Sequence, residues 1–166
     1  MGVFSRPRAG PFQERASPSM RPRAVVWRPG ISRSVALEVA AMLASATVTT
    51  ILPAVDLDRA RDFYEHKLGL TPVGAQPDGK FVYQCGGTLL ALFPRGAPTK
   101  ADHTAVSFEV ADIVSEIAAL EEKGVTFNDY DLPGLKTVAH VCVLGAEKAA
   151  WFNDTEGNIL CLHEKL

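Results

Sequence analysis

Cysteine and histidine side chains give this chain its clearest capacity to bind a metal ion. His103 begins one apolar stretch, and Cys161 and His163 alternate within another near the C-terminus. Because strand side chains alternate, Cys161 and His163 point to one face and Leu160 and Leu162 to the other. Nitrogen and sulfur ligands of this kind suit zinc. The sequence favours the alternative, in which the thiol is a small buried apolar group and both imidazoles lie in solvent near strand ends.

A second group of side chains has the chemistry to line an apolar ligand site. These are the aromatic residues of the strand-like stretches: Tyr83, Phe93, Tyr130, Trp151 and Phe152. Aromatic residues on strands are more often part of a core than of a site. His140 follows a Pro- and Gly-containing stretch and is either a base or hydrogen-bond donor to a ligand, or an exposed loop residue.

Composition and charge exclude several functions. The chain has 166 residues, 47% of them apolar, which is enough for one core, and it has no apolar run of transmembrane length. Residues 1–46 carry seven Arg and two Glu, and residues 47–166 carry ten Lys and Arg and seventeen acidic residues. An acidic domain without a basic stripe predicts no nucleic-acid binding.

Cys85, Cys142 and Cys161 form no CxxC pair, which favours reduced thiols and a cytoplasmic location. No P-loop or nucleotide-binding glycine motif is present.

Residues 1–46 differ from the rest of the chain. The first 30 are rich in Arg, Pro, Ser and Gly and have no apolar period, so they predict a disordered or poorly ordered extension. An organellar transit peptide and coding sequence translated from too early a start are the alternatives, with Met20 and Met42 as later starts. The spacing at 33–44 allows a short helix.

The pattern from residue 47 predicts strands and two helices. The expected strands are 48–54, 70–75, 80–85, 88–93, 104–110, 125–130, 138–144, 147–152 and 159–163. The first helix covers 57–67, and the second runs from 113 to the residue before Gly124. Asp56 and Asp112 directly precede the helices, as helix N-caps do. Gly69 and Gly124 follow them, where a left-handed residue is common.

The same order of elements occurs twice. Val55-Asp56-Leu57 matches Ala111-Asp112-Ile113, and Gly69-Leu70-Thr71 matches Gly124-Val125-Thr126. The stretch from Gly87 to Leu92 matches the stretch from Gly157 to Leu162. Three matches in one order predict two consecutive βαβββ repeats, at about 47–94 and 104–164, within a single domain of residues 47–166.

These residues resemble the vicinal oxygen chelate superfamily, which includes glyoxalase I, extradiol dioxygenases and fosfomycin- and bleomycin-resistance proteins. The resemblance rests on Pro53 to Tyr64 with Leu68-Gly69-Leu70, on Val106 to Asp112, and on Phe152 to Leu160. It implies an α+β fold in which two tandem βαβββ units form a curved sheet around a cleft. It also implies a homodimer and a small-molecule ligand on the concave face of the sheet.

Metal-dependent members of this superfamily place His or Glu at four positions of the cleft. The repeat puts Thr49, Ala91, Ala105 and Cys161 at those positions. Only Cys161 is a good ligand, and a catalytic metal needs at least three. We therefore expect no metal cofactor, and we expect the cleft to involve Thr49, Tyr83, Ala91, Phe93, Ala105, His140, Trp151 and Cys161.

Three functions remain open from the sequence. The vacant ligand positions favour a protein that binds a small organic molecule without a metal. The first alternative is a lyase or dioxygenase with a divalent metal at a displaced site, formed by His103, Cys161 and His163. The second is a regulatory module without a ligand. The sequence predicts no membrane segment in any of the three cases.

Overall fold

The computed structural model describes residues 43–166. The short helix expected at 33–44 and most of the expected extension lie outside these residues, and residues 43–45 form a turn. Within the described part, no helix is long and apolar enough to cross a membrane.

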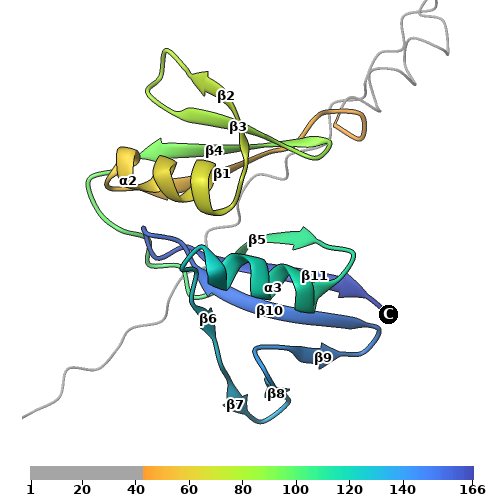
Figure 1. Ribbon diagram of the computed structural model, residues 1–166. Coiled ribbons are helices and arrows are strands. Elements are labelled where there is room, and N and C mark those ends of the chain that lie inside the picture. The colour runs from red at the N-terminus through yellow and green to blue at the C-terminus, as the bar shows by residue number, and fades with distance from the viewer. Residues whose placement is uncertain (1–42) are drawn as a thin grey trace, which may run out of the picture. The chain divides into compact units, whose positions relative to one another are not determined.

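The first repeat is a four-stranded sheet with one helix packed against it (Figure 1). Its elements are β1 (Thr49–Ala54), α2 (Leu57–Asp62), η1 (Phe63–Lys67), β2 (Thr71–Ala75), β3 (Phe81–Cys85) and β4 (Thr88–Pro94). The strand order is β1-β4-β3-β2, with β1 parallel to β4 and the other pairs antiparallel. The helix predicted at 57–67 is present, and its last five residues are wound as a π-helix.

The second repeat has the same order of elements with a more irregular middle part. Its main elements are β5 (Thr104–Glu109), α3 (Ile113–Glu122), β6 (Phe127–Asn128), β9 (Cys142–Leu144), β10 (Glu147–Asn153) and β11 (Ile159–Lys165). The sheet order is β5-β11-β10-β6, and β9 also pairs with β10. The fold is therefore α+β with two βαβββ repeats, as the sequence predicts.

The strands predicted at 125–130 and 138–144 are largely wrong, because only β6 and β9 form there. Between these two ranges lies a small hairpin of β7 (Asp131–Leu132) and β8 (Leu135–Lys136). Ala139 and His140 both have left-handed backbone angles, with φ of 48° and 69°. Such angles interrupt a strand, and they explain why β9 begins only at Cys142.

Both predicted helix caps are confirmed. The Asp56 carboxylate accepts a hydrogen bond from Arg59 N at 3.0 Å. The Asp112 carboxylate accepts from the backbone N–H of Val114 and of Ser115, at 3.1 and 3.2 Å. Each cap satisfies N–H groups that have no partner inside the helix.

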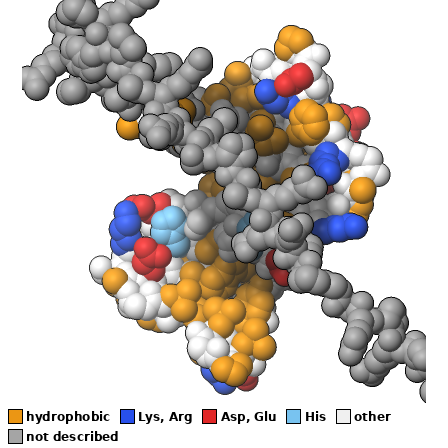
Figure 2. Space-filling model, turned by 180° about the vertical axis from the view of Figure 1, so that it is seen from behind, with side chains coloured by type: hydrophobic (Ala, Val, Ile, Leu, Met, Phe, Trp, Pro, Cys, Tyr) orange, Lys and Arg blue, Asp and Glu red, His pale blue; other side chains and the backbone are white. Residues whose placement is uncertain are grey.

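The core lies between the helices and one face of each sheet. Its largest fully buried side chains include Tyr64, Tyr83 and Phe152, together with leucines of β1, β4 and β11. Because the helices cover this face, a ligand that binds against a sheet would contact the opposite face. Figure 1 shows both helices in front of their sheets, and Figure 2 shows the protein from behind.

Candidate functional site

The face of the second sheet opposite α3 carries the predicted thiol and imidazole. Leu160 and Leu162 on β11 are buried in the core, whereas His163 Nδ1 lies 2.8 Å from Ser107 Oγ on β5. Cys161 is paired directly with Ser107 across the parallel β5–β11 ladder. The predicted assignment of Cys161 and His163 to the face opposite the leucines is confirmed.

The four positions at which related enzymes hold a metal do not form a ligand set. Thr49 is exposed at the start of β1, and Ala91 is buried on β4 opposite Ile51. The β5–β11 register shifts between Ile159 and Leu160, and Ala105 beside this shift packs against the core. Only Cys161 among the four has a strong donor atom, so these residues do not fit a catalytic metal.

Cys161 itself is poorly suited to bind a metal. The residue is 5% exposed, and burial raises the pKa of its thiol, an effect that the hydrogen bond with Ser107 only partly opposes. The thiol also donates to Leu162 O at 3.1 Å. The thiolate is the form that binds metals. Burial and the raised pKa favour the neutral thiol, which binds metals poorly.

The structure does not bring His103, Cys161 and His163 together. Among residues 43–166, no three His, Cys, Asp or Glu side chains are grouped so that they could hold a metal ion. His163 instead contacts Ser107, and its Nε2 lies 3.7 Å from Glu109 Oε2. The displaced metal site considered from the sequence is therefore not assembled.

An aromatic hollow of about 290 Å³ lies in the second repeat. It is lined by Asp102, His103, Thr104, Tyr130, Leu135, Trp151 and Ile159. The rings of Tyr130 and Trp151 are 5.6 Å apart and nearly perpendicular, at 88°. Trp151 Nε1 donates to Thr104 Oγ1 at 3.1 Å, which fixes the indole. Figure 2 shows apolar side chains gathered over this lower part of the molecule.

Three of the predicted cleft residues lie apart from this hollow. Tyr83 is fully buried on the helix side of the first sheet, where its ring stacks on Tyr64. Phe93 is 38% exposed at the end of β4. His140 lies 3.4 Å from Glu121 of α3 and against the Phe127 ring, on the helix side of the second repeat.

Of the eight predicted cleft residues, only Trp151 lines the hollow. Asp102 and Thr104, which also line it, were not singled out from the sequence. They lie at the start of β5, where a polar residue before a strand carries no distinctive pattern.

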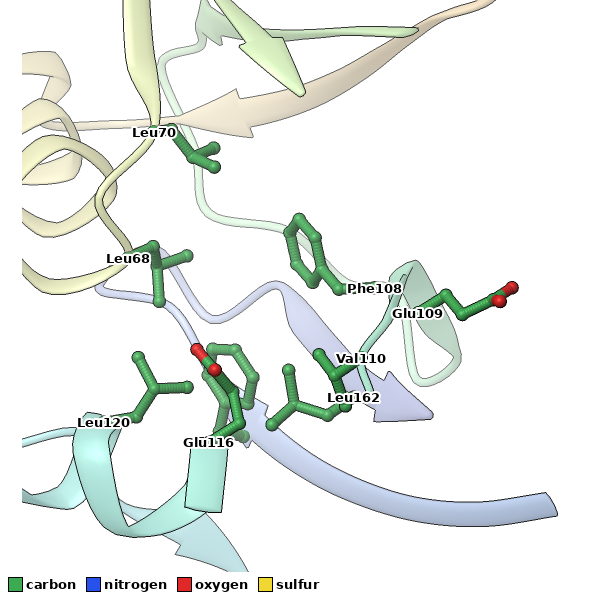
Figure 3. Close-up of a pocket in the computed structure, with 9 residues that line it drawn as sticks. Leu68, Leu70, Phe108, Glu109, Val110, Glu116, Leu120 and Leu162 are labelled. Atoms are coloured by element: carbon green, nitrogen blue, oxygen red, sulfur yellow. The ribbon is translucent and has the colours of Figure 1, made fainter. Parts of the chain in front are cut away.

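A second hollow, of about 220 Å³, lies on the helix side. Its walls are Leu68, Leu70, Phe108, Val110, Leu120, Phe152 and Leu162, with Glu109 and Glu116. Figure 3 shows the Glu116 carboxylate turned toward the apolar side chains and Glu109 directed away from them. This hollow contains neither paired aromatic rings beside a polar anchor nor a group of metal donors.

Comparisons with known proteins agree with the fold. Residues 46–162 match the family model of the Glyoxalase/Bleomycin resistance protein/Dioxygenase superfamily. YurT of Bacillus subtilis (strain 168) is 31% identical over 134 residues, which cover 71% of this chain and 98% of YurT.

Solved structures with the same fold include a glyoxalase/bleomycin resistance protein/dioxygenase from Alicyclobacillus acidocaldarius. It has a TM-score of 0.56 and 18% identity, over 74% of this chain and 92% of that one. Another is TnmS3 of Streptomyces sp. CB03234, described as an antibiotic binding protein, with a TM-score of 0.51 and 21% identity over 74% and 97%. The family model covers well over half of the chain, and the chain belongs to the glyoxalase/bleomycin resistance protein/dioxygenase superfamily.

Proposed function

We propose that this protein binds a small organic molecule, without a metal ion, in the aromatic hollow of the second repeat. The observation that carries the proposal is the pairing of Tyr130 and Trp151 in a hollow of about 290 Å³. Ligand sites typically combine apolar and aromatic walls with a few polar groups. Here the polar groups are Asp102, His103 and the Thr104 hydroxyl. The antibiotic binding described for TnmS3 is consistent with such a role on this fold.

The absence of a metal is part of the proposal and rests on the donor atoms. Thr49 offers a weak donor, Ala91 and Ala105 offer none, and Cys161 is a buried thiol with a raised pKa. Tag-free protein purified without chelator should contain well under one metal per chain by elemental mass spectrometry. Near-stoichiometric metal that disappears in Cys161→Ala would instead support a lyase or dioxygenase.

Ligand binding is tested through Trp151, whose ring is a wall of the hollow. The other tryptophan, Trp27, is replaced by Phe so that fluorescence reports on Trp151 alone. Titration with a panel of small aromatic compounds should give saturable quenching by some of them, and those compounds should raise the melting temperature by mass action. No quenching and no thermal shift across the panel would contradict the proposal and favour a module without a ligand.

A matched pair of variants locates the binding site. Leu135→Trp adds bulk to a side chain that lines the hollow, and it should abolish ligand binding. Leu132→Trp adds the same bulk on the neighbouring strand of the β7–β8 hairpin, at a residue that is 56% exposed and outside the hollow lining. It should leave the affinity unchanged. Both variants contain a second indole, so their binding is measured by calorimetry.

We further propose that the protein forms homodimers in the cytoplasm. The large apolar residues Val138, Val143 and Leu144 are 42–72% exposed, and such side chains favour burial against a partner. The three cysteines are free thiols, which is consistent with a reducing compartment. Light scattering coupled to gel filtration should give twice the chain mass, and a monomer at micromolar concentration would contradict the dimer.

A further inference from the structure

We infer that the aromatic hollow selects organic cations, meaning ligands with a quaternary or protonated amine attached to a small apolar body. This inference rests on the proposed function and specifies the ligand class of the same site. It follows from three features of the lining: the two perpendicular rings, one carboxylate, and the lack of a lysine or arginine.

The two rings form a corner that presents π surface. Tyr130 and Trp151 meet at 88° with centroids 5.6 Å apart. The indole N–H is already bound to Thr104 Oγ1, so a ligand meets the indole ring rather than its donor. Aromatic faces carry negative partial charge and attract a cation lying within about 6 Å of the ring centre. In this edge-to-face pair the edge of one ring covers part of one face of the other, and the uncovered ring faces are the surfaces that a cation can contact.

The charge of the lining favours the same class of ligand. Asp102 is the only carboxylate among the lining residues, and within residues 43–166 it makes no hydrogen bond or ion pair that would neutralise it. The one lysine of the β7–β8 hairpin, Lys136, is already paired with Asp131 at 3.1 Å. An anionic ligand would meet Asp102 with no lysine or arginine among the lining residues to offset it, whereas a cationic ligand would be attracted.

The remaining walls suit the apolar part of such a ligand. Leu135 and Ile159 are half-buried and line the hollow together with the rings. A trimethylammonium group combines a positive charge with methyl surface, so it can contact these side chains and the ring faces together. A volume of about 290 Å³ accommodates a ligand of only modest size.

Choline and 3,3-dimethylbutanol provide the test, because they have the same shape and differ in charge. Their dissociation constants are measured at pH 8 in the Trp27→Phe background, by Trp151 fluorescence and by calorimetry. A cation–π contribution of about 1 kcal/mol or more corresponds to at least about fivefold tighter binding of choline. Equal affinities would overturn the inference and leave ligand binding itself intact. If neither these compounds nor the aromatic panel binds, both the inference and the proposed function fail.

Single substitutions test which side chains of the hollow favour a cationic ligand. Tyr130→Leu removes one ring and should weaken choline binding at least severalfold, whereas Tyr130→Phe keeps the ring and should preserve it. Asp102→Asn should weaken choline binding and leave the neutral analogue unchanged. Glu116→Gln is the matched control, because it removes the same charge from the helix-side hollow. Loss of choline binding in Glu116→Gln but not in Asp102→Asn would overturn the inference. Thermal melts confirm that each variant is folded.

Discussion

Glu156 binds Arg59 with two hydrogen bonds that connect the loop of one repeat to the helix of the other. Glu156 Oε1 accepts from Arg59 Nε and Nη2 at 3.0 and 2.8 Å. Glu156 Oε2 accepts from the backbone N–H groups of Val55 and Asp56, at 2.6 and 3.1 Å, where α2 begins. The Glu156 side chain is only 1% exposed, whereas that of Arg59 is 52% exposed. The buried carboxylate therefore satisfies the backbone at the start of the first helix and also pairs with Arg59 at the surface.

Replacing Glu156 by Gln should destabilise the protein at neutral pH. The amide removes the negative charge and cannot accept all the hydrogen bonds that the carboxylate accepts, so we expect a loss of about 2 kcal/mol in the free energy of unfolding. Urea denaturation at pH 7 measures this loss. Glu116→Gln makes the same chemical change at a carboxylate with no partner among the described residues, and it should be nearly neutral.

The contribution of Glu156 should also disappear in acid. Burial alone would raise the pKa of Glu156, but the Arg59 hydrogen bond and the backbone N–H groups of Asp56 and Val55 outweigh it and lower the pKa. A group with a lowered pKa stabilises the fold above its unfolded pKa of about 4.3, and this contribution is lost as the pH falls through the folded value. The difference between wild type and Glu156→Gln should therefore shrink between pH 5 and pH 3. A constant difference across this range would contradict the assignment.

Local patterns predicted the parts of the fold that depend on neighbouring residues. Asp56 and Asp112 were identified as caps because the carboxylate and its N–H partners lie within three positions of each other. The left-handed angle of Gly157, with φ of 87°, is likewise a local feature, because Gly157 lies in the turn-forming run Asn153 to Asn158. The two βαβββ repeats were also predicted from short sequence patterns of this kind.

Features that depend on distant residues could not be read from the sequence. Glu156 looked like an ordinary turn residue, because its partner Arg59 is 97 positions away. The contact between Ser107 and His163 depends on a register shift in the β5–β11 ladder that no local pattern indicates. The aromatic hollow likewise requires the β7–β8 hairpin, which brings Leu135 to its wall.

The two helix caps should respond differently to conservative and non-conservative substitution. Asn keeps a side-chain oxygen that can accept from the helix N–H groups, so Asp112→Asn should change the melting temperature little. Ala removes the acceptor, and Asp112→Ala should lower the melting temperature by a few degrees. Asp56→Asn and Asp56→Ala should show the same contrast. Loss of ligand binding in a folded Asp112→Asn variant would indicate a functional role in place of the capping role.

The three thiols should react in the order of their exposure. Cys85 is partly exposed, whereas Cys142 and Cys161 are 3% and 5% exposed. An aromatic disulfide reagent should modify one thiol of the native protein first, and all three after denaturation in urea. Because burial raises the pKa of both Cys85 and Cys161, even the first reaction should be slower than that of a free cysteine. Cys85→Ser should remove the first phase, and persistence of that phase would show that Cys142 or Cys161 is accessible.

The turn before β9 should gain stability from a single glycine. Ala139 has φ of 48°, a left-handed angle that strains any residue with a β-carbon by about 1 kcal/mol or more, whereas glycine adopts it freely. Glycine also increases the entropy of the unfolded chain, which offsets part of the gain. We therefore expect Ala139→Gly to raise the free energy of unfolding by up to about 1 kcal/mol. Ala146→Gly is the control, because Ala146 is an exposed turn residue without a left-handed angle; it should be neutral or destabilising. Destabilisation by Ala139→Gly equal to that of the control would show that the left-handed angle at Ala139 carries no strain.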